Sequence, residues 1–337
     1  MTYHIIYSLA WLVSLLPYRA LYAISDGLYL LVYHIIRYRR KVVGKNLSTS
    51  FPEKSSAEIK TIERQFYHWL CDYAVETIKL LHVSDDELLR HLEFRGCDEV
   101  EKYLDKGQSV AWMLGHYCNW EYLSATALGM KRWGILKDEV RGARCEVRKD
   151  EVRGTRCEVR KDEVRGARCE VREESRAVMG LIYKPLRNKS VDRLFLKIRQ
   201  SHYGTCVARN DILRKLVQLR QESRLSIFGY IADQGPKWEN IHLWLDFLGH
   251  DTPVFTGSER IIRKMRQPVF YIDMERPGRG RYVCTAHLIT EHPEQMEEHE
   301  LTRCYFQLLE QSIRRAPQYY LWSHKRWKRQ RELTIDN

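Results

Sequence analysis

The sequence predicts an α/β fold in which one mixed sheet is flanked by helices. Apolar runs with the length of a buried strand recur between residues 110 and 289, and helical patterns separate most of them. Strands that alternate with helices form layers around a single sheet. The chain has 337 residues, of which 44% are apolar, which is enough for one large core or two smaller ones.

The N-terminal segment, residues 1–41, differs from the rest of the chain. Its apolar stretches at 4–16 and 20–36 are separated by a proline and an arginine, and a basic cluster lies at 37–41. A bilayer span needs about 20 apolar residues, so each stretch alone is short. The pattern fits one imperfect span, a re-entrant hairpin, two interfacial helices or a helix pair packed on the main domain. Recurring tyrosines favour a membrane-associated helical segment, and the basic cluster favours the cytoplasmic side for the remainder of the chain.

The main domain, residues 42–337, contains the other predicted helices and strands. A capping-box pattern at 55–58 opens an amphipathic helix over 55–82, and the polar residues 84–106 predict short helices. Strands are predicted at 110–114, 178–184, 204–208, 225–232, 268–274 and 281–289. Further helices are predicted at 190–202, 211–223, 256–266 and 294–315.

Residues 137–172 interrupt this pattern with three tandem copies of a twelve-residue unit, KDEVRGARCEVR in the first. Valine and cysteine are its only sizeable apolar side chains, which is too few for a core. Its cysteines match no familiar zinc spacing, and the chain has no Cys-x-x-Cys pair, so no metal site is predicted. We expect the repeat to be a surface insertion in the 42–337 domain.

The net charge of +12 predicts a polyanionic partner, such as a nucleic acid, an anionic membrane or an acidic protein, with general solubility as the alternative. The sequence has no helix-turn-helix, zinc-finger or single-strand-binding motif, which argues against nucleic acid. It also has no phosphate-loop or dinucleotide fingerprint, so no organic cofactor is predicted.

Polar side chains come directly after several predicted strands, where ligands bind in open α/β sheets. His116 comes after the strand 110–114, and Glu121 lies at the start of a predicted helix that Asn119 would cap. An imidazole accepts a proton near neutral pH, and a carboxylate on its other ring nitrogen fixes the tautomer. The spacing predicts a general base with an orienting carboxylate, although alone it also fits a structural pair.

Several blocks carry a resemblance to a known family. Gly115–Glu121 resembles the HX4(D/E) motif of lysophospholipid-type acyltransferases, and its Asn-Trp-Glu ending is similar to that of the late acyltransferases of lipid A biosynthesis. Cys118 stands where that family more often has glycine. Further blocks resemble the family in order, the last being the most specific: Tyr183–Asn188, Arg209-Asn210, Ala232–Gln234, Phe255–Gly257 and Ala316–Lys328. The resemblance covers the chain except 137–175.

The resemblance implies an acyltransferase-type fold for residues 42–337 and O-acyl transfer from an acyl carrier protein thioester. The implied acceptor is a hydroxyl of a phosphorylated glycolipid, a lipid A precursor, and the implied place is the cytoplasmic side of a bacterial inner membrane. His116 would be the general base and Glu121 its partner, with no metal or cofactor. Substrate-binding roles are implied for Arg187, Asn188, Arg209, Asp233, Thr256 and Gly257.

Other interpretations stay open at the level of the sequence. The acceptor could be another membrane lipid, or the chain could be a catalytically inactive protein that binds a membrane surface. Arg187 and Arg209 also fit ordinary ion pairs, Asp233 a structural role, and Thr256 a plain helix cap. The aromatic and basic run 319–331 predicts an interfacial anchor, or else a solvated tail.

Overall fold

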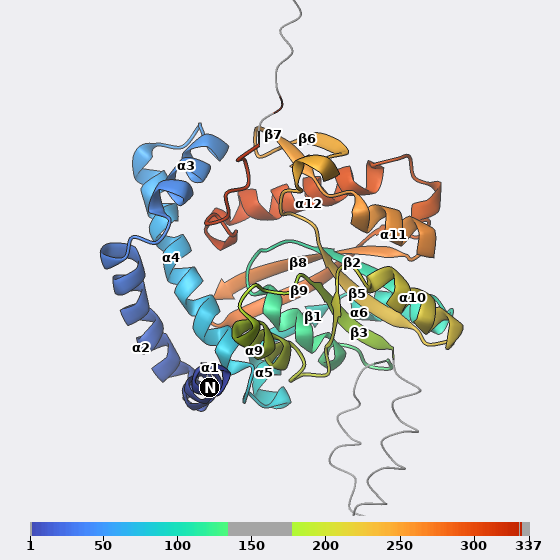
Figure 1. The fold of residues 1–337 in the computed structure, drawn as a ribbon, viewed down its shortest axis with the longest axis horizontal. Coiled ribbons are helices and arrows are strands. Elements are labelled where there is room, and N and C mark those ends of the chain that lie inside the picture. The colour runs from blue at the N-terminus through green and yellow to red at the C-terminus, as the bar shows by residue number, and fades with distance from the viewer. Residues whose placement is uncertain (1, 134–176, 330, 332–337) are drawn as a thin grey trace, which may run out of the picture.

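A computed structural model describes residues 2–133, 177–329 and 331. The predicted insertion at 137–172 lies outside the described residues. A seven-stranded mixed sheet with the order β1-β9-β8-β2-β5-β3-β4 forms the centre of the molecule (Figure 1). Its strands are β1 Leu92–Arg95, β2 Val110–Leu114, β3 Val178–Tyr183, β4 Thr205–Ala208, β5 Ser226–Ile231, β8 Val269–Gly278 and β9 Arg281–Thr290.

The direction of the strands makes the sheet mixed, as predicted. β2 pairs in parallel with both β5 and β8, and β3 pairs in parallel with β5 and β4. β9 runs antiparallel to β8, and β1 pairs in parallel with β9. The predicted strands are confirmed, whereas β1 and a separate hairpin of β6 Leu243–Phe247 and β7 His250–Val254 were not predicted.

Helices flank the sheet (Figure 1). They are α1 Thr2–Ser14, α2 Tyr18–Tyr29, α3 Arg40–Ser50, α4 Ser56–Lys79, α5 Asp85–His91, α6 Cys97–Asp105, α9 Lys189–Arg199, α10 Ile212–Gln221, α11 Gly257–Met265 and α12 Glu300–Arg315. A π-helical segment, Leu30–Ile35, extends α2, and a 3-10 segment, Trp120–Leu128, comes after β2.

Helix α4 is the long amphipathic helix that the sequence predicts. Its capping box is formed, because Ser55 accepts from the Glu58 backbone N–H while the Glu58 carboxylate accepts from the Ser55 N–H. Its buried face includes Phe66 and Trp69. Trp69 and Tyr73 pack against the ring of Trp120, so α4 lies beside the turn that leaves β2.

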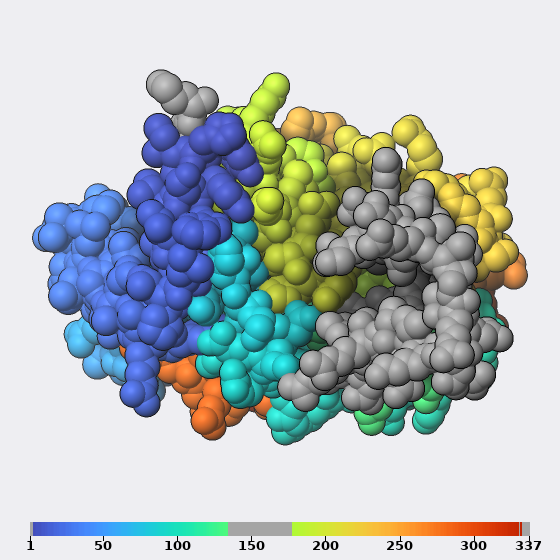
Figure 2. All heavy atoms as spheres, turned by 90° about the horizontal axis from the view of Figure 1, so that it is seen from below, coloured from blue at the N-terminus to red at the C-terminus, as the bar shows by residue number. Residues whose placement is uncertain are grey.

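The N-terminal helices pack on the main domain and still expose apolar side chains. α1 lies against α9 (Figure 2). The Arg193 guanidinium lies over the ring of Tyr3, and the Lys197 ammonium lies over the ring of Tyr7. α2 packs along α4. Ile5, Leu9 and Leu12 of α1 remain exposed at helical spacing. In the part of the chain that the structure describes, no helix is both long enough and apolar enough to span a bilayer.

Part of the C-terminal run 319–331 is buried, whereas its composition predicts a surface anchor or a solvated tail. Tyr320 and Trp322 are buried, and Tyr320 forms an antiparallel bridge with Tyr117. The Asn46 amide of α3 donates to the Trp322 carbonyl at 2.8 Å. Backbone pairing and ring burial therefore make this segment part of the support for the turn after β2.

Candidate active site

The register of the sheet brings His116 and Asp233 together. Leu114 at the end of β2 pairs with Ile231 at the end of β5. The residues two positions further on therefore leave the sheet side by side, at the carboxyl ends of parallel strands. His116 Nδ1 lies 2.6 Å from Asp233 Oδ1, and the His116 backbone N–H donates to Asp233 Oδ2 at 3.2 Å.

These contacts orient the imidazole ring of His116. A carboxylate next to Nδ1 holds the proton on that nitrogen, so Nε2 carries the free lone pair. The side-chain amide of Gln234 lies 3.3 Å from Nε2, on the side of the ring opposite Asp233. The Trp120 ring and the imidazole pack in a T-shaped arrangement, with ring centroids 5.1 Å apart. The His116 side chain is 18% exposed, so a substrate can reach it.

Neighbouring groups keep the Asp233 carboxylate ionised. Burial alone would raise its pKa, but His116, its hydrogen bonds and the nearby Arg326 bring the pKa down to about 2. Arg326 is itself buried, and its guanidinium lies 4.9 Å from the centroid of the Phe247 ring. An ionised carboxylate at this position stabilises the imidazolium that forms when His116 takes up a proton.

The turn after β2 is held by the C-terminal segment. The Cys118 N–H donates to the Tyr319 carbonyl at 2.9 Å, and the Leu321 N–H donates to the His116 carbonyl at 3.2 Å. Cys118 has a φ of 50°, in the left-handed region that favours glycine. Burial raises the pKa of its thiol well above the usual value, so this cysteine is not an activated nucleophile.

Glu121 does not pair with His116 as the spacing predicts. Its carboxylate is held by Arg199 at the end of α9, through a bidentate ion pair with distances of 2.7 and 2.6 Å. The Tyr73 hydroxyl of α4 donates to the same carboxylate at 3.4 Å. The 3-10 turn points Glu121 toward α4 and α9, and this leaves Asp233 as the carboxylate on the His116 ring.

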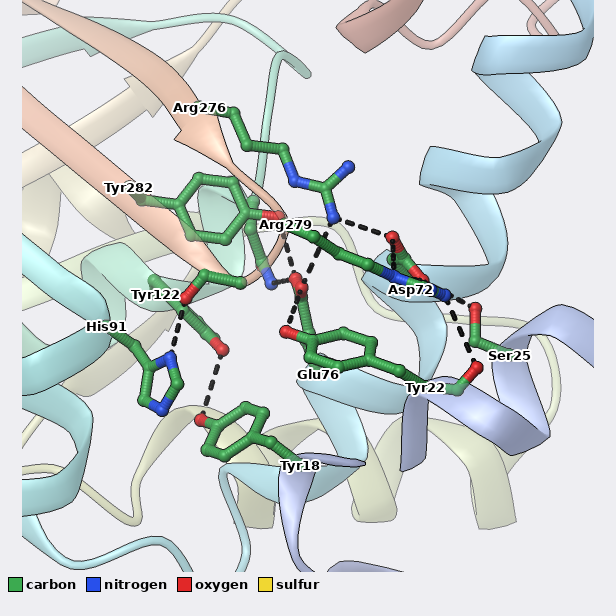
Figure 3. Close-up of polar contacts among 12 residues, drawn as sticks. Tyr18, Tyr22, Ser25, Asp72, Glu76, His91, Tyr122, Arg276, Arg279 and Tyr282 are labelled. Carbon is green, nitrogen blue, oxygen red and sulfur yellow. Dashed lines mark hydrogen bonds and ion pairs between the residues drawn. The ribbon is translucent and has the colours of Figure 1, made fainter. Parts of the chain in front are cut away.

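Asn119 does not cap a helix either, because its side chain is used elsewhere. Its amide donates to Glu76 of α4 at 2.9 Å. The Tyr282 hydroxyl donates to the same Glu76 oxygen at 2.7 Å, and Tyr22 of α2 donates to the other one at 3.0 Å. Figure 3 shows this buried network, in which Arg276 lies between Asp72 and Glu76.

Among the described residues, no hydrogen bond or ion pair joins Arg187, Asn188 or Arg209 to the His116–Asp233 pair. Arg187 and Arg209 are exposed side chains. Asn188 caps α9, because its side-chain oxygen accepts from the backbone of Ser190 and Val191. Asp233 contacts His116 Nδ1 at 2.6 Å, and its predicted contact with substrate stays a prediction.

Thr256 and Gly257 begin helix α11, after the hairpin of β6 and β7. Among the described residues, no hydrogen bond joins either of them to His116 or Asp233. In the same part of the chain, no cluster of three histidine, cysteine or acidic side chains is arranged to hold a metal ion.

Sequence reasoning missed Arg199, Tyr73 and Gln234 as site residues. Tyr73 lies within α4 and Arg199 is the last residue of α9, and no local pattern distinguishes them from other helix residues. Gln234 had a usable signal, since it comes directly after Asp233 at the end of a strand beside β2.

The fold and the His116–Asp233 pair define a class of protein, an α/β protein with a histidine–aspartate pair at the carboxyl edge of its sheet. The sequence matches the family described as bacterial lipid A biosynthesis acyltransferase over residues 1–135 and 171–329, so the chain belongs to that family. The two matched stretches leave out most of the repeat at 137–172.

A curated relative is the lipid A biosynthesis lauroyltransferase of Escherichia coli (strain K12). It is 27% identical over 125 residues, which make up 37% of this chain and 40% of that protein. The aligned part therefore spans less than half of the relative.

Proposed function

We propose that this protein transfers a fatty acyl chain from an acyl carrier protein thioester to a hydroxyl of a lipid A precursor. The family supports acyl transfer in lipid A biosynthesis. The main structural support for the proposed reaction is the 2.6 Å contact between His116 and a buried, ionised Asp233. The basic excess of the chain suits both an acidic carrier protein and a phosphorylated acceptor.

In the proposed reaction, Nε2 of His116 accepts the proton of the acceptor hydroxyl once Gln234 is displaced. The oxygen attacks the thioester carbonyl and forms a tetrahedral intermediate, whose collapse breaks the carbon–sulfur bond. The carrier thiolate leaves and takes the proton from the imidazolium, so the products are the new ester and the free thiol. Asp233 stays ionised throughout and stabilises the positive ring.

Glu121 is proposed to be a positioning residue. Its ion pair with Arg199 ties the turn after β2 to α9, and its contact with Tyr73 ties the same turn to α4. Trp120, between Asn119 and Glu121, packs on both Tyr73 and His116. The Glu121 contacts therefore set the position of the ring that lies on the base.

We propose that the protein works on the cytoplasmic face of the inner membrane, with the N-terminal helices in the interface. The exposed apolar side chains of α1 and its place beside α9 support this arrangement. A helix that lies in the membrane interface does not need the length that crossing the bilayer requires.

The test is an acyl-transfer assay with the purified full chain, read by mass spectrometry. The donors are a panel of acyl carrier protein thioesters, and the acceptors are a phosphorylated glucosamine disaccharide lipid and a control phospholipid. We expect the disaccharide lipid to gain one acyl chain with release of free carrier thiol. Acylation of the control lipid alone would contradict the proposed acceptor, and no transfer from any thioester would contradict the donor.

A further inference from the structure

A basic and aromatic pocket lies where the end of α2 and the π-helical segment Leu30–Ile35 meet α4. Its volume is about 390 Å³. The residues that line it are Tyr29, Tyr33, His34, Arg40, Lys60 and Arg64. π-Helical turns are rare and occur often at functional sites. None of these residues belongs to the His116 site, so the pocket needs an explanation of its own.

The pocket carries more positive than negative charge. Arg40 and Lys60 share the carboxylate of Glu63, at 3.2 and 3.0 Å. Arg64 is exposed and makes no ion pair or hydrogen bond with the residues that the structure describes. Three cations against one carboxylate leave an excess that suits an anion.

Aromatic rings hold these cations in place before any ligand arrives. The Arg40 guanidinium lies 4.3 Å from the centroid of the Tyr33 ring, and the Lys60 ammonium lies 5.4 Å from it. Tyr29 stacks on His68 of α4, with centroids 3.5 Å apart. A site whose side chains are already ordered loses less entropy on binding.

Apolar side chains continue the surface beside the pocket. Leu30 and Leu31 are 57% and 40% exposed, and Ile35 and Ile36 are 73% and 58% exposed. Leu30, Leu31 and Ile35 belong to the same helical segment as Tyr33 and His34 of the pocket, and Ile36 is the residue that follows it. Exposed apolar side chains next to cationic groups are typical of surfaces that bind anionic bilayers.

We propose that this pocket binds the phosphodiester of an anionic phospholipid while the side chains of residues 30, 31, 35 and 36 enter the bilayer. Arginine and lysine bind phosphate oxygens, and the adjoining apolar side chains can accompany the acyl chains of the same lipid. A free phosphate ion would leave those apolar side chains in water. The inference rests on the proposed membrane association but does not require acyl transfer.

The test is co-sedimentation of the full chain with vesicles. One set is phosphatidylcholine alone, and in the other phosphatidylglycerol replaces part of it. The pocket variant is K60Q/R64Q, which keeps the Arg40–Glu63 ion pair, and R214Q/R220Q removes the same charge from α10. We expect the wild type to prefer the anionic vesicles and the pocket variant to bind them about tenfold less tightly or worse. The α10 variant should bind as the wild type does.

Two results would overturn the proposal. One is equal binding of the wild type to both vesicles, and the other is an equal loss in the pocket and α10 variants, which would show that only total charge matters. Competition by inorganic phosphate at constant ionic strength, together with unchanged binding of I35S to the vesicles, would identify an ion site and likewise contradict the lipid.

The fold and the activity are checked separately. The pocket variant should keep the circular dichroism spectrum of the wild type and its acyl-transfer rate on acceptor dispersed in neutral detergent micelles. A wild type that prefers anionic vesicles but transfers no acyl chain would remove the proposed function and leave the pocket proposal standing.

Discussion

At the scale of single residues, the carboxylate that contacts His116 is not the one that the sequence predicts. The spacing within one motif selects Glu121 as the partner of His116, but the sheet places Asp233 on the ring. The polar residues at the ends of strands contained this information, since His116 and Asp233 both come after predicted strands. The order of the strands, which makes β5 the neighbour of β2, could not be predicted from the sequence.

Substituting Asp233 and Glu121 one at a time distinguishes support of the His116 imidazolium from positioning of the turn after β2. We expect Asp233→Asn to lower kcat by about 10²- to 10⁴-fold with little change in KM, because the imidazolium loses its counter-charge. Glu121→Gln should mainly lower stability, by about 3 kcal/mol, because it leaves Arg199 without its charged partner. Steady-state kinetics and urea unfolding measure the two effects. A larger loss of kcat in a stably folded E121Q than in D233N would contradict this assignment.

At the scale of helices and strands, periodicity predicted the elements that local sequence determines. The capping box and apolar spacing of α4 predicted that helix, and short apolar runs predicted β2, β3, β4, β5, β8 and β9. The hairpin of β6 and β7 was missed because its turn is Leu248-Gly249, which lacks the usual Asn-Gly signal. Both turn residues have positive φ, and Glu310 of α12 accepts from the Leu248 N–H. A tertiary contact therefore supports this turn.

The buried network in Figure 3 links helices to the turn after β2 and cannot be derived from any one segment. Glu76 is fully buried, and burial raises its pKa against the effect of Arg276 and Tyr282. It accepts from α2, from the β8–β9 hairpin and from Asn119. Removing its charge should therefore affect the turn that carries Trp120.

We expect Glu76→Gln to lower the free energy of unfolding by about 3 kcal/mol, since Arg276 and the three donors lose part of their shared acceptor. We also expect kcat to fall under conditions where the variant stays folded, because Asn119 is released. Thermal unfolding and kinetics below the transition measure this. Ser48 on α3, exposed and outside the network, provides a control in Ser48→Ala. A stable E76Q with full kcat would contradict a positioning role.

At the scale of the whole molecule, the C-terminal segment packs against the turn after β2 that carries the site. Composition predicted a surface run, and only the backbone pairing with residues 117 and 118 shows its place. Burial lowers the pKa of His324 in this segment to about 4, with Arg326 acting in the same direction. The folded state therefore resists protonation of this histidine.

This shift makes stability depend on pH. Between about 6.5, the usual histidine pKa, and about 4, the unfolded chain takes up a proton that the folded chain does not, so stability falls as the pH falls. We expect His324→Gln to make this decrease in the free energy of unfolding smaller by up to about 3 kcal/mol. Urea unfolding of both proteins across this range measures the difference. Parallel pH curves for the two proteins would contradict the assignment.

The most direct measurement of the central claim is the single-turnover rate of acyl transfer by His116→Ala, compared with His287→Ala, which removes an exposed histidine of β9. The proposed mechanism predicts that H116A keeps its fold and loses about 10²-fold or more of the rate, while H287A matches the wild type. A folded H116A that transfers the acyl chain at the wild-type rate would contradict the claim that His116 is the base.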